Sequence, residues 1–173
     1  LTRDLAQRFN RDYGETFRLP EVFIPKVGAK IAALDDPSKK MSKSEENDNS
    51  RINMLDEPDT VRRKFRRAVT DSGSEIRFDE SRPGVTNLLS VYQIMTGRAP
   101  AEIESHFEGK GYGKLKEEVA EATVEYLRPF RERVLAITDE ELNRVLADGR
   151  DRARSIAGET LRRVYERLGI VGA

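Results

Sequence analysis

The sequence predicts a predominantly α-helical protein in which a short α/β portion, residues 1–55, precedes an all-α helical bundle, residues 56–173. Three observations support this. Apolar residues recur at helical spacing along most of the chain after residue 56. Proline, threonine or glycine stands where several of these segments begin or end. Residues 16–25 instead combine two prolines with β-branched residues, a composition that favours an extended edge segment.

Composition excludes several classes of chemistry. The chain has no cysteine and a single histidine, His106, so disulfides, cysteine-ligated zinc and thiol catalysis are excluded, and we expect no metal site and no catalytic triad. Lys+Arg and Asp+Glu both total 31, so net charge gives no indication of a nucleic-acid partner. No segment is typical of a signal peptide or a membrane span, so we expect a cytoplasmic protein without a membrane partner.

The first 55 residues contain one predicted helix, one extended segment and one polar loop. Thr2 is the predicted N-cap of a helix that carries Leu5, Phe9 and Tyr13 and stops at Gly14. The extended segment follows, and residues 26–53 show only weak periodicity. This portion is typical of the end of an α/β structure in which a strand leads into a loop.

The remaining chain is predicted to be helical almost throughout. Helices are expected from residue 58 to about 71, over 85–95 with a stop at Gly97, from residue 100 to about 107, and over 115–137 after a glycine-rich joint. Thr138 fits a capping box, and two further helices are expected, one near 139–146 and one over 151–168. Short turns predict an antiparallel bundle, with Tyr92, Tyr126 and Phe130 in its core.

The polar loop contains the sequence Lys40-Met41-Ser42-Lys43-Ser44. Lysine is a compact charge on a mobile stem, which suits phosphate oxygens that move during a reaction, and serine hydroxyls and loop amides add donors. Such a loop could stabilise the charge that develops on a leaving pyrophosphate. It is not a P-loop, because the required glycine spacing is absent. The alternative is a solvated surface loop without a ligand.

This pentapeptide matches the signature of class I aminoacyl-tRNA synthetases at every position, and its neighbours resemble bacterial tryptophanyl-tRNA synthetases. The resemblance extends over essentially the whole chain and in the same order. The segments that carry it are LTRDLAQRFN (1–10), PKVGAKI (25–31), DPSKKMSKS (36–44), AVTDS (68–72), PGVTNLL (83–89) and FEGKGYG (107–113).

The resemblance implies roles for six residues. Lys40 and Lys43 would contact the ATP phosphates and act in catalysis, with Lys43 the stronger candidate for transition-state charge. Met41 and the hydroxyl or backbone donors of Ser42 and Ser44 would complete the phosphate site, and the backbone of Ile31 would contact adenine. Residues 1–55 would be the C-terminal part of a Rossmann-type catalytic domain, and residues 56–173 an α-helical anticodon-binding domain.

The function implied is that of a tryptophan–tRNA ligase. Such an enzyme joins tryptophan to ATP, with Mg²⁺ on the phosphates, and transfers the tryptophanyl group to tRNA(Trp); the family is homodimeric. The family's His-x-Gly-His signature and tryptophan pocket have no counterpart here, so the chain resembles the C-terminal half and is predicted to be inactive alone. The alternative is a non-catalytic helical module that binds RNA or protein and retains an unused lysine loop.

Candidate tRNA contacts are all basic. The run Arg62-Arg63-Lys64-Phe65-Arg66-Arg67 places five cations around one aromatic residue, either as a phosphate-binding patch or as an ordinary charged helix surface. By the resemblance, the anticodon would be read from the last helices, where the candidates are Arg150, Arg152, Arg154, Arg162 and Arg163. His106 is expected to be an interfacial helix residue without a catalytic role.

Overall fold

The computed structural model describes residues 1–25 and 28–170, which form two compact units. Unit 1 combines Leu1–Ile24 with Ile137–Ala173, and unit 2 is Pro25–Ala136. These units do not coincide with the predicted division at residue 55. That division rests on the family resemblance and stays a prediction.

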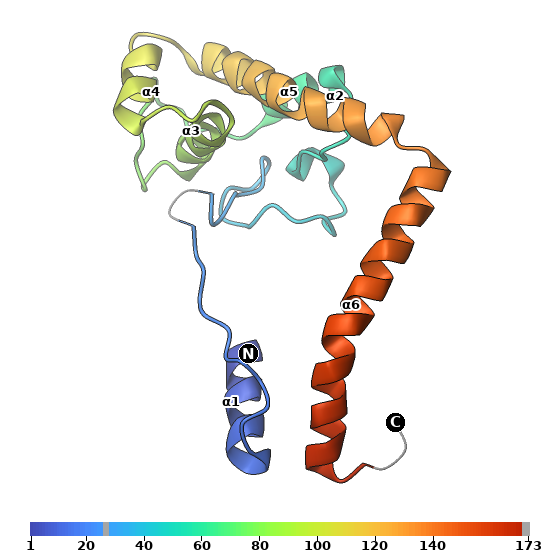
Figure 1. Ribbon diagram of the computed structural model, residues 1–173. Helices are drawn as coiled ribbons and strands as arrows, with labels where there is room; N and C mark the ends of the chain where they lie inside the picture. The colour runs from blue at the N-terminus through green and yellow to red at the C-terminus, as the bar shows by residue number, and fades with distance from the viewer. Residues whose placement is uncertain (26–27, 171–173) are drawn as a thin grey trace. The chain divides into compact units, whose positions relative to one another are not determined.

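Unit 2 holds the lysine loop and four α-helices. The helices are α2 (Pro58–Arg67), α3 (Pro83–Thr96), α4 (Pro100–Phe107) and α5 (Tyr112–Ala136), and a 3₁₀ turn, η1 (Asp48–Ser50), precedes them. Helix α5 packs across both α2 and α3, and α4 packs on α3 (Figure 1). The fully buried side chains at the centre of this arrangement include Val61, Phe65, Leu88, Leu89, Ile103, Phe107, Leu115 and Val119. The predicted all-α packing is confirmed for these helices.

Proline and glycine mark most helix boundaries in unit 2, as expected. Helices α2, α3 and α4 each begin with proline, where a missing N–H costs nothing, and α3 ends at Gly97 in the left-handed conformation. Gly84 has a packing role, because a Cβ atom there would lie 2.5 Å from the carbonyl oxygen of Val69. Helix α2 ends at Arg67, four residues before the predicted stop.

Unit 1 contains two helices, α1 (Thr2–Tyr13) and α6 (Asp139–Leu168). Helix α1 ends at Gly14 as predicted, but Thr2 is its first residue and not its cap. Thr138 caps α6 by accepting a hydrogen bond from the Glu141 amide, which confirms that part of the capping box. The prediction of two helices after Thr138 is wrong, because one helix of 30 residues runs through the whole segment.

Three other expectations differ from the structure. Residues 16–25 form no strand, and the described residues contain only an isolated β-bridge, between Ala32 and Lys40. Tyr126 and Phe130 are 54% and 41% exposed, so only Tyr92 of the three predicted core aromatics is buried. Helix α6 buries none of its residues and belongs to unit 1, so the helical bundle of unit 2 comprises α2 to α5. No described helix combines the length and the apolar character that a membrane crossing requires.

Candidate nucleotide-binding loop

A small hairpin positions the first lysine of the loop. The Ala33 amide donates to the Lys39 carbonyl at 3.0 Å, and the Met41 amide donates to the Ile31 carbonyl at 2.8 Å. Asp36 closes the turn, since its carboxylate accepts hydrogen bonds from the Ser38 hydroxyl at 2.6 Å and the Ser38 amide at 3.1 Å. These two bonds lower the pKa of Asp36. The turn is therefore ordered by its own sequence.

The hairpin is attached to the helical core through backbone groups. The Asn87 side chain on α3 accepts from the Ala32 amide at 2.8 Å and donates to the Ala32 carbonyl at 3.0 Å. The Leu34 amide donates to the Ser50 carbonyl, and the Val69 amide donates to the Leu34 carbonyl. Leu34 itself is buried in the core. The base of the lysine loop is thus held by α3 and by the segments on either side of α2.

The two candidate lysines are exposed and have no ion-pair partner among the described residues. Lys39 differs, because its ammonium group lies 3.5 Å from Asp36. Within the loop the hydroxyl groups of Ser42 and Ser44 are 3.1 Å apart, and the Ser44 amide lies 3.4 Å from the Ser42 hydroxyl. Two uncompensated cations and two hydroxyls therefore share one short surface segment, a combination suited to an anion such as phosphate.

Ile31 and Met41 lie beside each other at the base of the loop. Both side chains are partly buried and pack against the core of unit 2. The Ile31 carbonyl is occupied by the Met41 amide, whereas the Ile31 amide has no hydrogen-bond partner among the described residues. The Ile31 amide is therefore the backbone group left for a ligand. Its contact with adenine stays a prediction.

Sequence reasoning missed a buried cation that supports the far end of the loop. The Lys64 side chain is 0% exposed, and its ammonium group lies 2.8 Å from both Asp48 and Asp56. Hydrogen bonds from Lys64 and Asn53 lower the pKa of Asp48. Burial raises the pKa of Asp56, but hydrogen bonds from Lys64 and Asn53 outweigh this effect, so the pKa of Asp56 is lowered as well. The available signal was the position of Lys64 three residues after Val61, on the apolar stripe of α2.

The structure sorts the basic run of α2 into paired and unpaired cations. Arg62 donates to Glu121 on α5 at 2.7 and 2.9 Å and to Asp59 at 2.9 Å. Lys64 is fully buried and paired with Asp48 and Asp56. Arg63, Arg66 and Arg67 are exposed, and the described residues offer them no ion pair. The ordinary helix-surface interpretation therefore fits Arg62, and three arginines remain candidates for phosphate contact.

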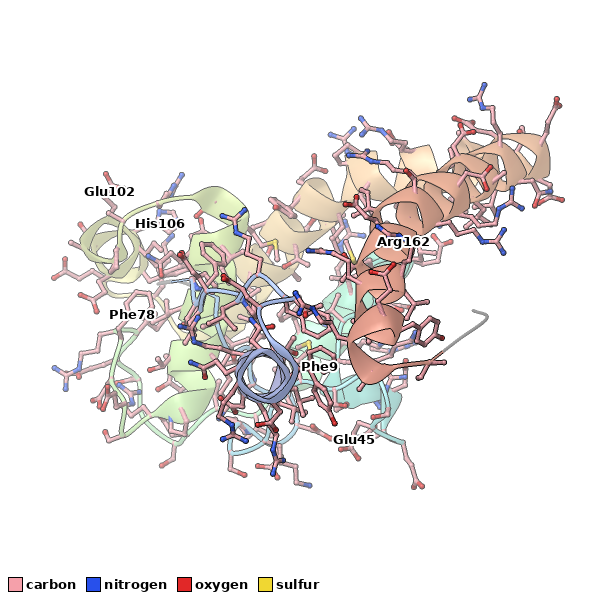
Figure 2. The ribbon with its side chains drawn as sticks, turned by 60° about the horizontal axis from the view of Figure 1, so that its bottom comes forward. Phe9, Glu45, Phe78, Glu102, His106 and Arg162 are labelled. Carbon is pink, nitrogen blue, oxygen red and sulfur yellow. The ribbon has the colours of Figure 1, made fainter. Side chains whose placement is uncertain are left out.

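The five arginine candidates on α6 also include both paired and unpaired side chains. Arg150 pairs with Asp151 at 2.7 Å, and Arg162, labelled in Figure 2, pairs with Glu166. Arg152, Arg154 and Arg163 are exposed without an ion pair in the described part of the chain. The role of this helix in anticodon reading stays a prediction.

His106 on α4 has an acidic partner that the sequence did not reveal. Its Nε2 atom lies 2.5 Å from the Glu118 carboxylate on α5, and the Lys110 ammonium group lies 3.0 Å from both side chains. The imidazole also stacks on Tyr92, with ring centroids 6.2 Å apart. These contacts agree with an interfacial position between α4 and α5.

Comparison with known proteins decides the family. Residues 1–128 match the family described as tRNA synthetases class I (W and Y). The chain belongs to this family. Among the described residues, no group of three or more carboxylate or imidazole side chains could hold a metal ion.

Curated relatives and solved structures agree with this membership. The chain is 52% identical over 173 residues to a tryptophan–tRNA ligase of Wolinella succinogenes and 49% identical over 172 residues to one of Caldanaerobacter subterraneus, with 99% of this chain and 53% of each relative covered. A tryptophanyl-tRNA synthetase structure from Mycoplasma pneumoniae superposes with a TM-score of 0.85 at 34% identity, covering 96% of this chain and 51% of that one. The Campylobacter jejuni enzyme complexed with ADP and tryptophan gives a TM-score of 0.64 at 28% identity, covering 96% and 52%. The chain spans about half the length of these relatives.

Proposed function

We propose that this chain is the C-terminal half of a tryptophan–tRNA ligase, which activates tryptophan with ATP and transfers it to tRNA(Trp). The observation that carries the proposal is the 52% identity to such a ligase over 99% of this chain, which contains an intact Lys-Met-Ser-Lys-Ser segment. In such an enzyme, residues 1–55 would complete a Rossmann-type catalytic domain and residues 56–173 would bind the anticodon region.

The lysine loop supplies the electrostatic part of activation. The tryptophan carboxylate attacks the α-phosphorus of ATP, the bond to the bridging oxygen breaks, and pyrophosphate leaves with additional negative charge. Lys40 and Lys43 would stabilise that charge because neither is neutralised by a carboxylate of the described residues. Donors from Ser42 and Ser44 and the backbone at Met41 would orient the phosphates, and the Ile31 amide would contact adenine.

The remaining partners follow from the family. Mg²⁺ would be bound by the ATP phosphates, and no residue of this chain is assigned to it. tRNA(Trp) would contact exposed arginines of α2 and α6, the enzyme would be a cytoplasmic homodimer, and the tryptophan pocket would lie mostly outside this chain. We therefore expect the 173 residues alone to be inactive.

The decisive experiment is tryptophan-dependent ATP–pyrophosphate exchange, combined with an intact-mass measurement on the same sample. A full-length protein that includes this chain should exchange only when tryptophan is present, and a sample with the mass of 173 residues should not exchange. A full-length protein without exchange that still binds RNA would favour the non-catalytic module instead.

Lys43→Ala in the full-length protein tests the role of the loop. Removing one donor that faces developing charge typically lowers the rate by about 10²-fold or more, whereas tRNA affinity should hardly change. Lys39→Ala is the matched control, because the Lys39 ammonium group already lies beside Asp36. Exchange within twofold of the unmodified protein for Lys43→Ala would contradict the assignment.

A further inference from the structure

Among the described residues, the Arg51 side chain alone makes a hydrogen bond from outside to residues 42–46, the part of the lysine loop beyond the hairpin. The five residues 42–46 lie between two fixed ends, the hairpin at Met41 and the η1 turn that begins after Asn47. Hydrogen bonds inside the loop join Ser42 to Ser44 and Glu45. Among the described residues, a single hydrogen bond reaches residues 42–46 from outside: Arg51 Nη1 donates to the Glu45 carbonyl at 2.6 Å. Glu45, labelled in Figure 2, directly follows the signature pentapeptide.

All three guanidinium nitrogens of Arg51 are engaged. Besides its bond to the loop, Nε donates to the Asn53 side-chain oxygen at 3.1 Å, and Nη2 lies 3.1 Å from the Asp48 carboxylate. The side chain is only 17% exposed. A guanidinium group presents its donors in a rigid fork, so two bonds made on one side fix the direction of the third. Arg51 is therefore held in a single orientation toward the loop.

The position of Asp48 is in turn set by the core. Its second carboxylate oxygen lies 2.8 Å from the Lys64 ammonium group, and the Lys64 side chain is fully buried in α2. The side-chain Nδ2 of Asn53 donates to the same Asp48 oxygen that faces Arg51, at 3.2 Å. An unbroken series of contacts thus runs from buried Lys64 through Asp48 and Arg51 to the loop backbone. We call these three side chains the loop anchor.

We propose that Arg51 is a positioning residue for the activation step, holding residues 42–46 of the lysine loop through Glu45 so that Lys43 meets the ATP phosphates in one arrangement, while the hairpin positions Lys40. The inference rests on the proposed function for its catalytic part. Its physical basis is preorganisation: residues already ordered before ATP binds do not lose that conformational freedom in the transition state. Arg51 itself would not touch ATP.

Hydrogen exchange measured by mass spectrometry on the full-length protein tests whether the anchor orders the loop. Arg51→Ala should lower the protection of the Ser44 and Glu45 amides, which are the hydrogen-bonded amides described within residues 42–46, by about tenfold. This is the size expected for losing one hydrogen bond to a charged donor, and α3 and α5 should be unchanged. Arg98→Ala, an exposed arginine of unit 2 without an ion pair in the described residues, is the matched control. Unchanged loop exchange in Arg51→Ala would overturn the proposal.

Asp48→Asn tests the series of contacts. It keeps the size of the side chain but removes the charge that faces Arg51, so loop protection should fall here too. In the Arg51→Ala background the same change should have no further effect on the loop, because both act through one bond to Glu45. Additive effects of the two substitutions would show that Asp48 does not act through Arg51.

Steady-state kinetics test whether the order of the loop affects the rate of tryptophan activation. In ATP–pyrophosphate exchange, Arg51→Ala should lower kcat about tenfold while KM for tryptophan stays the same, since a positioning effect on phosphate contact acts on the transition state. Faster loop exchange with unchanged kcat would overturn the catalytic role. If the unmodified protein shows no exchange activity, the proposed function fails, and hydrogen exchange still decides whether Arg51 holds the loop.

Discussion

The Asn87 side chain on α3 pairs with both backbone groups of Ala32, accepting from its amide at 2.8 Å and donating to its carbonyl at 3.0 Å. A buried carboxamide here does what a neighbouring strand would do in a sheet, satisfying one donor and one acceptor of an extended residue. Because Ala32 pairs with Lys40 across the hairpin, this contact attaches the base of the lysine loop to the helical core.

Asn87→Ala should destabilise unit 2. Both backbone groups of Ala32, which are partly buried, lose their partner. An unsatisfied buried group costs about 1–3 kcal/mol, so for these two groups we expect the free energy of unfolding to fall by about 2–3 kcal/mol, near the low end of that range. Urea denaturation followed by circular dichroism measures this. Gln93→Ala, a partly exposed amide on the same helix, should change stability by less than half as much, and equal losses would contradict the special role of Asn87.

Lys64→Met should lower the free energy of unfolding by more than Arg63→Met, the substitution at the preceding residue. It leaves Asp56, which is only 12% exposed, without its cation, and breaking a buried ion pair from one side costs about 3–5 kcal/mol. The half-exposed Asp48 can turn to water, so we expect about 3 kcal/mol, at the low end of that range. Arg63→Met, on an exposed site of the same helix, is the control. Similar unfolding midpoints for the two variants would argue against the buried pair.

Acid stability should depend on Asp71. Arg82 donates two hydrogen bonds to its carboxylate, at 2.8 and 3.1 Å, and the Tyr112 hydroxyl donates a third at 2.6 Å; together they hold the pKa of Asp71 far below its usual range. A depressed folded-state pKa contributes stability that is present above the unfolded value of about 4 and is lost as pH falls toward the folded value.

Asp71→Asn should therefore flatten the decline of stability below about pH 4, and Tyr112→Phe should flatten it less, because the two bonds from Arg82 remain. Urea midpoints measured at a series of acidic pH values provide the test. A slope in Asp71→Asn equal to that of the unmodified chain would show that other carboxyl groups determine acid unfolding.

The unpaired arginines of α2 should contribute to RNA binding through phosphate contacts. Arg66→Ala should reduce the slope of log affinity for tRNA against log salt concentration by about one, because each neutralised phosphate releases counterions. Arg62→Ala should leave the slope unchanged, since Arg62 is already held by Glu121 and Asp59. Equal effects of the two substitutions would indicate a general charge effect.

Local patterns in the sequence were sufficient to predict most helices. Proline at the starts of α2, α3 and α4, glycine at the ends of α1 and α3, and threonine before α6 act within a few residues, so their effects survive without tertiary information. Helix α6 runs on where two helices were predicted, because the chain between 146 and 151 has no proline and glycine at 149 only weakens a helix without ending it.

The sequence by itself determined the helical character, the lysine loop and the family, because periodicity and a contiguous motif are local properties. Only the tertiary structure decided which cations are free. Lys40 and Lys64 are chemically identical, yet one is exposed without an ion pair in the described residues and the other is buried between Asp48 and Asp56. Likewise Arg51 became an anchor only through contacts with Glu45, Asp48 and Asn53. The physical reason is that electrostatic pairing depends on distance in space, which the folded backbone sets.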